Sequence, residues 1–157
     1  MDHIALDIRP ARAQDVPALV DLTRRAWLSG NCELAPIEAV RHWVEADFES
    51  RWYAEEWPRV RLGWIGERPV GLVLTDGDDV GGLWVHPSFQ RRGIGSRLMD
   101  VGEAEIRAAG HTRARLQYSE WNVAAPLFYR ARGYVETGSS TDLFGVERRV
   151  IAMRRDL

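Results

Sequence analysis

The chain has 157 residues, a formal net charge of −2 and one cysteine, Cys32. This length suits a single domain over residues 1–157, and 45% hydrophobic with 28% charged residues is the balance of a globular protein rather than a disordered one. The small negative charge argues against nucleic-acid binding through a global positive field, and one cysteine excludes an intramolecular disulfide and a cysteine-rich metal site. No run reaches the length of a membrane span, and the first seven residues lack the basic and long apolar regions of a secretory leader. We therefore expect a cytoplasmic protein.

The N-terminal third predicts one strand followed by helices. Apolar residues alternate over residues 4–9, which indicates a strand. Asp15 is expected to cap a helix with an apolar face, and the helix should break at residues 29–31, Ser-Gly-Asn. A second helical segment, continuous or restarted, is predicted over residues 36–58.

This second segment is rich in acidic and aromatic side chains. Its acids outnumber two arginines and are Glu33, Glu38, Glu45, Asp47, Glu49, Glu55 and Glu56. They form either a solvated helix face or a negative entrance that attracts a cationic molecule. The aromatic residues here and in the first helix either anchor the core or line a binding pocket; they are Trp27, Trp43, Trp52, Tyr53 and Trp57.

From Val60 the apolar period changes to two, which predicts a run of strands. Residues 60–65 and 70–75 are expected to pair through a hairpin turn at 66–69, and a third strand follows at 80–85. The pair Gly81-Gly82 inside the third strand predicts a bulge or a close backbone approach.

The third strand leads into a turn rich in glycine and then into a helix. Pro87 ends the strand, because it has no N–H for the ladder. Gly93 and Gly95 let the backbone bend sharply and approach a ligand. The helix should end at Gly110, and the residues expected on its core face are Ile94, Leu98, Val101, Glu105 and Ala108.

The start of this helix has the chemistry of a phosphate site. The first N–H groups of a helix lack partners within it and lie at the positive end of its dipole. Arg91, Arg92 and Arg97 add formal charge to the same turn. The expected ligand is a polyanion with several phosphate oxygens, held largely by main-chain N–H groups.

The C-terminal part predicts one strand, one helix and two more strands. The strand covers residues 113–119, and Asn122 is a good N-cap for a helix that ends near Gly133. The last two strands, 134–137 and 146–153, are expected to be linked by a polar loop. The order of elements predicts a mixed α/β sheet with helices on both faces.

Two blocks of residues resemble the signature motifs of the GCN5-related N-acetyltransferase (GNAT) superfamily. The first is Gln90-x-x-Gly93-x-Gly95, similar to the acyl-CoA pyrophosphate loop. The second is Asn122-x-x-Ala125-x-x-Phe128-Tyr129-x-x-x-Gly133-Tyr134, similar to the C-terminal motif. Together they cover roughly residues 70–135, while the N-terminal third matches only in outline.

The resemblance implies the acyl-CoA N-acyltransferase fold: about seven strands, mostly antiparallel, with strands four and five splayed apart. The pantetheine arm of acetyl-CoA would lie in that gap and pair with the main chain of Leu83, Trp84 and Val85. The pyrophosphate would be held by the loop residues Gln90, Arg91, Arg92, Gly93, Ile94, Gly95 and Ser96. Asn122 would bond the arm or hold the gap open, and it is at the same time a plain N-cap.

The resemblance also implies roles in catalysis. Tyr129 would be the general acid that protonates the departing thiolate, since a phenol with a pKa of about 10 is protonated at neutral pH. The N–H of Trp84 or Val85 would bind the oxyanion. The base that takes the proton of the amine would be Asp79, reached by counting back from the motif, or Glu120 at the end of the following strand; either is equally interpretable as a solvated residue.

The predicted function is transfer of an acetyl group from acetyl-CoA to a primary amine, directly within a ternary complex and without a metal. Cys32 lies far in sequence from both blocks, which disfavours a cysteinyl acyl-enzyme. We expect a small-molecule or peptide amine as acceptor, no nucleic-acid or membrane partner, and a monomer or homodimer. The alternatives are an acyl-CoA-binding module without turnover, and a dinucleotide-binding domain, whose motif requires a glycine where Leu98 stands.

Overall fold

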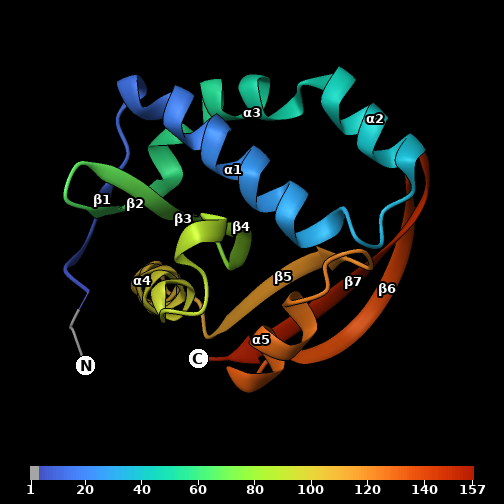
Figure 1. Ribbon diagram of the computed structural model, residues 1–157. Coiled ribbons are helices and arrows are strands. Elements are labelled where there is room, and N and C mark those ends of the chain that lie inside the picture. The colour runs from blue at the N-terminus through green and yellow to red at the C-terminus, as the bar shows by residue number, and fades with distance from the viewer. Residues whose placement is uncertain (1–3) are drawn as a thin grey trace.

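The computed structural model describes residues 4–157 as a seven-stranded sheet with helices on both faces (Figure 1). The strand order is β1-β2-β3-β4-β5-β7-β6, and every neighbouring pair is antiparallel except β4–β5. The strands are β1 Leu6–Pro10, β2 Val60–Ile65, β3 Arg68–Asp76, β4 Asp79–Val85, β5 Arg113–Ser119, β6 Val135–Phe144 and β7 Val146–Asp156. This architecture confirms the predicted fold class. Residues 1–3, which belong to the predicted domain and to the segment expected not to be a secretory leader, lie outside the described residues.

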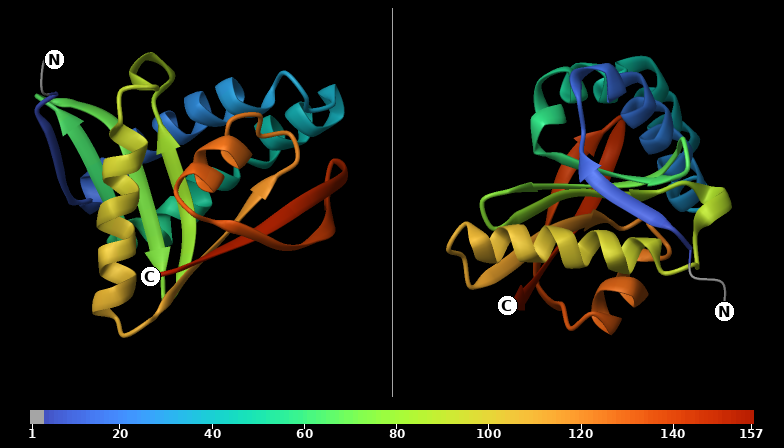
Figure 2. Two further views of the ribbon diagram at one scale, coloured as in Figure 1. Left: turned by 90° about the horizontal axis from the view of Figure 1, so that it is seen from below. Right: turned by 90° about the vertical axis from the view of Figure 1, so that its left-hand side faces the viewer.

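The helices lie on opposite sides of the sheet (Figure 2). One side carries α1 Val16–Asn31, α2 Ile37–Ala46 and α3 Phe48–Glu56; the other carries α4 Ile94–Ala108 and α5 Ala125–Ala131. Single 3₁₀ turns stand at Ala13–Asp15, Trp57–Arg59 and Pro87–Phe89. None of the helices within residues 4–157 is both long and apolar enough to cross a membrane.

Each side of the sheet has its own hydrophobic core. On one side α1 and α3 pack on β2, β3 and β4 through buried residues such as Leu19, Tyr53 and Leu72. On the other side α4 and α5 pack on the sheet through buried residues such as Leu98 and Tyr129. The two cores hold the two faces of β4 in place, and β4 is the strand that leads to the predicted phosphate turn.

Strands β4 and β5 pair only at one end and then separate. The parallel pairing is limited to Asp79 with Arg115 and Val80 with Leu116. At this vertex the Arg115 N–H donates to the Asp78 carbonyl oxygen at 2.8 Å, and the Arg115 guanidinium donates to both carboxylate oxygens of Asp78 at 2.8 and 2.7 Å. Beyond the vertex β4 and β5 diverge (Figure 2, left), and the edge of β4 from Gly81 to Val85 has no strand partner on the β5 side. The splay expected from the family resemblance is therefore present.

The predicted irregularity at Gly81-Gly82 is a β-bulge. Leu74 of β3 pairs with Gly82, whereas the next residue, Thr75, pairs with Val80, so Gly81 is the extra residue. A Cβ at Gly81 would lie 2.9 Å from the Leu74 side chain, which explains why glycine stands at this place. The bulge occurs just beyond the point where β4 leaves β5.

The structure defines the helix boundaries of the N-terminal half. The first helix ends at Asn31, within the predicted break at residues 29–31, and the Asn31 side chain donates to the Trp27 carbonyl oxygen at 3.0 Å in its last turn. The helical segment after residue 36 restarts rather than continues: Asp47, with φ of 46°, separates α2 from α3. Asp15 is the N-cap residue, but its carboxylate accepts from the Arg12 N–H at 2.8 Å rather than from α1.

The polar loop predicted between the last two strands is wrong. Residues 135–144 form β6, which pairs with β7 over its whole length and turns at Gly145 with φ of 72°. β6 is the last strand of the sheet and its side chains are exposed apart from Phe144, so polar residues are accommodated there without burial. Composition therefore indicated a loop where the chain forms an exposed edge strand.

The core face of α4 is rotated from the predicted one. Ile94 and Leu98 are buried as expected, but Val101 and Glu105 are half-buried and Ala108 is exposed. The other buried residues are Met99, Gly102, Glu103 and Ile106. Gly102 lets the helix approach β3 closely, since a Cβ there would lie 3.1 Å from the Val73 side chain. The helix ends as predicted, with Gly110 at φ of 91°.

Candidate functional site

The segment between β4 and α4 is a tight turn held by its own side chains. His86 Nδ1 accepts from the Ser88 N–H at 3.1 Å, and the Gln90 side chain donates to the Val85 carbonyl oxygen at 3.1 Å. Arg91 and Gly93 adopt left-handed backbone conformations, with φ of 63° and 78°. These contacts bend the chain back so that α4 begins at Ile94, beside the open end of the gap between β4 and β5.

The first main-chain N–H groups of α4 have no acceptor within the helix. The first intrahelical bond is donated by the Arg97 N–H to Gly93, so the preceding N–H groups of the turn have no helical acceptor. No atom lies within 4 Å of the position that a Cβ would take on Gly93. The space and the dipole suit a phosphate group.

The three arginines predicted to surround this turn separate into two groups. Arg91 and Arg92 are exposed, and the Arg92 guanidinium lies over the Phe89 ring at 5.4 Å. Arg97 instead donates to the carbonyl oxygens of Ile4 and Leu6 at 3.2 and 3.1 Å. Arg97 therefore fastens the first strand to α4, and Arg91 and Arg92 remain for an anion.

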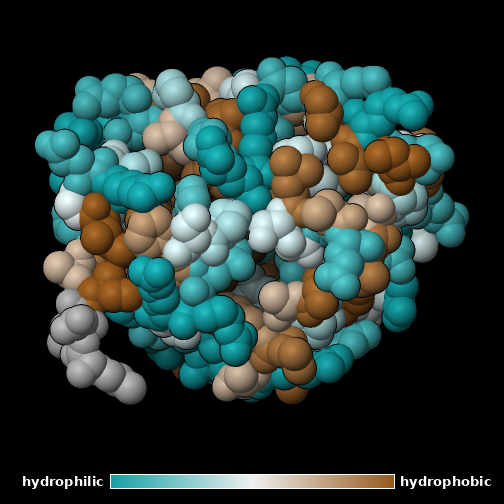
Figure 3. Space-filling view, in the orientation of Figure 1, coloured by the Kyte–Doolittle hydropathy of each residue, from teal (hydrophilic) through white to brown (hydrophobic). Residues whose placement is uncertain are grey.

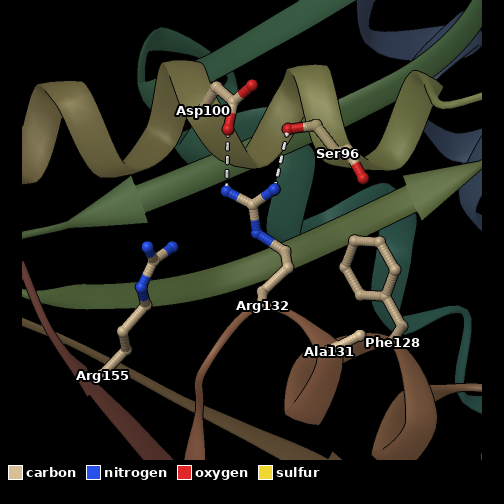
Figure 4. Close-up of a pocket in the computed structure, with 6 residues that line it drawn as sticks. All are labelled: Ser96, Asp100, Phe128, Ala131, Arg132 and Arg155. Carbon is tan, nitrogen blue, oxygen red and sulfur yellow. Dashed lines mark hydrogen bonds and ion pairs between the residues drawn. The ribbon is translucent and has the colours of Figure 1, made fainter.

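A cavity of about 420 Å³ opens beside the first turns of α4 (Figure 4). Its lining comes from α4, α5 and β7 and consists of Ser96, Asp100, Phe128, Ala131, Arg132 and Arg155. Arg132 donates to the Ser96 carbonyl oxygen at 3.3 Å and to the Asp100 carboxylate at 2.8 Å. Its Nε is buried and has no hydrogen-bond partner among the described residues.

Glu103 is the buried acceptor at which α4, α5 and β7 meet. Its carboxylate is 4% exposed and accepts from Arg132 at 2.9 Å, Arg155 at 3.0 Å and the Tyr134 hydroxyl at 3.0 Å. Burial, with the neighbouring carboxylate, raises the pKa of Tyr134. Sequence reasoning missed Glu103 because the predicted core face of α4 was rotated by about one residue from the observed one. With the correct face, an acidic residue at a buried position would have indicated a buried ion pair.

Asn122 lies three residues before α5, and Tyr129 lies within the helix. Tyr129 is buried, with its ring edge-to-face against Phe128 at 5.1 Å and Tyr134 at 5.7 Å. Burial raises the pKa of Tyr129, so its hydroxyl holds its proton at neutral pH. The N-cap residue of α5 is Ala124 rather than the predicted Asn122, but Asn122 Oδ1 accepts from the first helical N–H, that of Ala125, at 3.1 Å.

The predicted main-chain segment Leu83–Val85 borders the gap. It pairs with β3 on one edge, through Val73, Leu72 and Gly71, and its other edge lies beyond the β4–β5 pairing. Leu83 and Val85 point to the α4 core, while Trp84 points to the core beneath α1 and α3. The free edge of β4 is therefore followed along the chain by the turn of residues 86–93 and then by the N-terminus of α4.

The two predicted base residues lie in different surroundings. Asp79 is half-buried at the vertex, and burial, with the nearby Asp78 and Asp76, raises its pKa against the opposing effect of Arg115. Glu120 is exposed, and its carboxylate accepts from the Arg149 N–H at 2.8 Å, which ties the end of β5 to β7. The structure places Asp79 beside the bulge and Glu120 at the outer end of β5.

The acidic segment of α2 and α3 is only in part a free negative surface. Glu49 is buried and accepts from the Trp43 indole, Asp47 pairs with Arg24, and Glu56 pairs with Arg59 at 2.5 Å. The aromatic residues separate in the same way: Trp27, Trp43 and Tyr53 are core residues, and Trp52 and Trp57 are half-buried. No group of three or more potential metal ligands occurs within residues 4–157.

Comparison with known proteins identifies both the domain and the fold. The family model for the acetyltransferase (GNAT) domain matches residues 50–136, more than half of the chain. A GCN5-related N-acetyltransferase structure from Rhodopseudomonas palustris has a TM-score of 0.87 at 24% identity, with 100% of this chain and 99% of that chain covered.

Two further similar structures contain coenzyme A or acetyl-CoA. The paia N-acetyltransferase from Thermoplasma acidophilum, in complex with coenzyme A, has a TM-score of 0.81 at 16% identity, with 98% of this chain and 99% of that chain covered. The yncA structure from Salmonella typhimurium, with its cofactor acetyl-CoA, has a TM-score of 0.69 at 19% identity, with 98% and 94% covered. At these identities the likeness establishes the shared fold.

Proposed function

The chain belongs to the GNAT family of acetyltransferases, and from this premise we propose that it transfers an acetyl group from acetyl-CoA to a primary amine within a ternary complex. The observation that carries the proposal is the splay of β4 from β5, together with the start of α4, whose first N–H groups have no acceptor within the helix. A strand edge without a partner and a helix N-terminus at its end match an extended ligand with a diphosphate.

Binding of acetyl-CoA would use main-chain groups almost throughout. The diphosphate would accept from N–H groups of residues 91–96, with Arg91 and Arg92 adding charge. The pantetheine arm would pair with the free edge of Leu83, Trp84 and Val85 like an added strand. Asn122, which caps α5, would stand at the other side of the gap.

Acetyl transfer forms a bond between carbon and the amine nitrogen and breaks the C–S bond of the thioester. The amine nitrogen attacks the thioester carbon, the carbonyl oxygen becomes an oxyanion, and the C–S bond then breaks to release a thiolate. The N–H of Trp84 or Val85 would donate to the oxyanion. Tyr129 would give its hydroxyl proton to the sulfur and would take back the proton that the nitrogen loses as the amide forms. Burial raises the pKa of Tyr129, so the hydroxyl carries its proton at neutral pH.

The amine must be neutral when it attacks. An alkylammonium with a pKa near 10 is mostly charged at pH 7, so a group at the site has to accept its proton. Asp79 is our first choice as this base, because burial raises its pKa and makes the carboxylate a better proton acceptor. Glu120 is the second choice, since its carboxylate is already engaged by the Arg149 N–H.

The acceptor is proposed to be a small-molecule or peptide amine, with no nucleic-acid or membrane partner. A monomer or homodimer and a cytoplasmic location remain predictions from the sequence.

The test is an amine panel with acetyl-CoA, in which thiol release is followed and the acetylated product is identified by mass. Transfer to at least one primary amine is the expected result. Coenzyme A binding without acetylation of any amine in the panel would replace this proposal by a non-catalytic binding module. Absence of coenzyme A binding would refute both.

A further inference from the structure

Two indole rings from different elements meet at the bare main chain of Gly82. The position that a Cβ would take on Gly82 lies 3.6 Å from Trp84 Nε1 and 3.9 Å from Trp52 Cη2. Trp84 belongs to β4 and Trp52 to α3, and both rings are half-buried. Aromatic surface is thus presented beside a residue that has no side chain of its own.

This aromatic surface continues outward to solvent. Phe48 stacks on Trp52 with ring centroids 5.8 Å apart and is 53% exposed. Other exposed apolar residues stand on and before α2, namely Leu34, Ile37 and Val44. In the space-filling view a hydrophobic area lies at the upper right, over α2 (Figure 3). Apolar surface is thus exposed beside Trp52, through Phe48, and on and before α2.

Gly82 lies where an acceptor has to arrive. It adjoins the bulge at Gly81, next to the vertex of the gap. Trp84 and Trp52 lie on the side of the sheet covered by α1 and α3, whereas Tyr129 and α4 lie on the other side. If acetyl-CoA enters the gap from the α4 turn, the side of the two indoles is left for the amine.

The charges near the vertex suit a single cation. Asp78 pairs with Arg115, Asp76 pairs with Arg59 at 3.8 Å, and Glu56 pairs with the same Arg59. Asp79 makes no ion pair with another residue of the described chain. Glu55, one helical turn after Trp52, is exposed, and its charge is screened by water and salt. Asp79 is therefore the carboxylate that a single ammonium group can meet at the vertex.

The outer edge of this side is closed by packing. The turn of the β6–β7 hairpin lies against α2, since a Cβ on Gly145 would lie 2.9 Å from the Glu38 carbonyl oxygen. Phe144 packs edge-on to His42 at 5.1 Å and against Trp27 at 6.0 Å. A long peptide would have to separate this hairpin from α2, and a small molecule would not.

We propose that the acceptor of this enzyme is a small primary monoamine with an aromatic ring, an arylalkylamine, whose ring lies against Trp52 and Trp84 while its amine lies beside Gly82 and Asp79. The inference rests on the proposed acetyl transfer, because that reaction defines where the amine must be. Aromatic rings gain from edge and face contacts with indoles, and an ammonium gains from the indole faces as well.

The experiment measures binding first, so that it does not depend on turnover. The full chain is saturated with coenzyme A and titrated with 2-phenylethylamine, hexylamine, spermidine and a short peptide with a free amine, by calorimetry. Wild type is compared with Trp52→Ala, Trp84→Ala and Gly82→Val; the last adds side-chain volume between the indoles without removing core atoms. Trp64→Ala is the matched control, because Trp64 is a half-buried indole on β2 that lies against Arg9.

We expect 2-phenylethylamine to bind at least about tenfold more tightly than the other three amines. The two indole variants and Gly82→Val should each lose about tenfold or more of this affinity. Trp64→Ala should keep it, and Trp52→Ala and Trp64→Ala should keep their affinity for coenzyme A. Stronger binding of spermidine, hexylamine or the peptide, or unchanged affinity in all three site variants, would overturn the inference. Binding as expected but no acetylation of any amine would refute the proposed reaction and leave this site standing.

Discussion

At the scale of single residues, burial raises the pKa of two groups, one proposed as the general acid and the other as the general base. It raises the pKa of Tyr129 and so keeps a proton on the phenol, and it raises the pKa of Asp79 and so makes the carboxylate a better base. Tyr129 was proposed from its position within a motif, and Asp79 by counting back from another. Glu103 was not, because its role depends on Arg132, Arg155 and Tyr134, which come from other elements.

We predict that Tyr129→Phe lowers kcat by about 100-fold or more, because general acid catalysis contributes roughly 10²–10⁴. The KM for acetyl-CoA should change little, since the ring stays in place. Tyr53→Phe is the control: it also removes a buried hydroxyl, one that is hydrogen-bonded to Thr23 at 2.7 Å in the other core. A Tyr129→Phe enzyme with the wild-type kcat would exclude the acid role.

Asp79→Asn is predicted to affect activity and stability in opposite directions. Activity should fall, and the acid limb of the wild-type pH profile, which lies above the ordinary carboxyl pKa of 3.8, should disappear. Because the pKa is raised in the folded state, the ionised carboxylate destabilises the fold at neutral pH. The variant should therefore have a larger free energy of unfolding than wild type at pH 7, and the difference should shrink as the pH falls towards 3.8.

Denaturant unfolding of Asp79→Asn and wild type across this pH range measures the effect. A variant that is less stable than wild type at pH 7 would show that Asp79 is held by favourable contacts instead, and would remove the argument for a raised pKa.

At the scale of elements, local signals predicted the site better than they predicted its surroundings. The turn after β4, the bulge at Gly81 and the end of α4 at Gly110 follow from proline and glycine, whose preferences act within a few residues. The β6–β7 hairpin and the last turn of α1 depend on partners far along the chain. The Val123 N–H, for example, donates to the Gly30 carbonyl oxygen at 3.3 Å.

The α4 turn gives a test of coenzyme A binding. Gly93→Val should abolish measurable binding of coenzyme A, because the new side chain enters space that is free of protein atoms and is assigned to the diphosphate. Gly110→Val is the control, since Gly110 also has a positive φ and open surroundings. Both variants should lose about 1–2 kcal/mol of stability from backbone strain, and only Gly93→Val should lose the ligand in calorimetry. Equal coenzyme A affinity in the two variants would contradict the loop assignment.

The hairpin turn gives a test of the packing that closes the acceptor side. Gly145→Ala places a Cβ 2.6 Å from the His42 Cβ at a φ of 72°, so we expect a loss of about 2–4 kcal/mol from overpacking and strain together. Gly66→Ala has a φ of 60° and nothing within 4 Å, and should lose only the strain of about 1–2 kcal/mol. Thermal unfolding of both variants measures the difference. Equal losses of unfolding free energy would mean that the hairpin turn does not pack tightly against α2.

At the scale of the whole molecule, Glu103 joins the elements that surround the proposed coenzyme A site. Glu103→Ala should cost about 3–5 kcal/mol of unfolding free energy, because it leaves Arg132 and Arg155 without their buried acceptor. Glu105→Ala is the control; its pair with Arg61 is partly exposed and should be worth about 0–1 kcal/mol. Similar losses in urea unfolding would show that the buried cluster is dispensable.

The fold as a whole could be predicted because two blocks of this chain resemble family motifs in the right order. Those blocks contain the α4 turn and α5, which carry the donor side of the site. The N-terminal third contains no such block, and α1, α2 and α3 are placed by packing on β2, β3 and β4. This is why the sequence left the acceptor open and why Trp52 was seen only as one aromatic residue among several.

A crystal structure of the protein with acetyl-CoA tests the central claim most directly. The account predicts the diphosphate within hydrogen-bonding distance of the N–H groups of residues 91–96, and the pantetheine arm paired with β4 in the gap beside β5. Acetyl-CoA bound anywhere else on the molecule, or a gap between β4 and β5 filled by protein side chains in the complex, would contradict it.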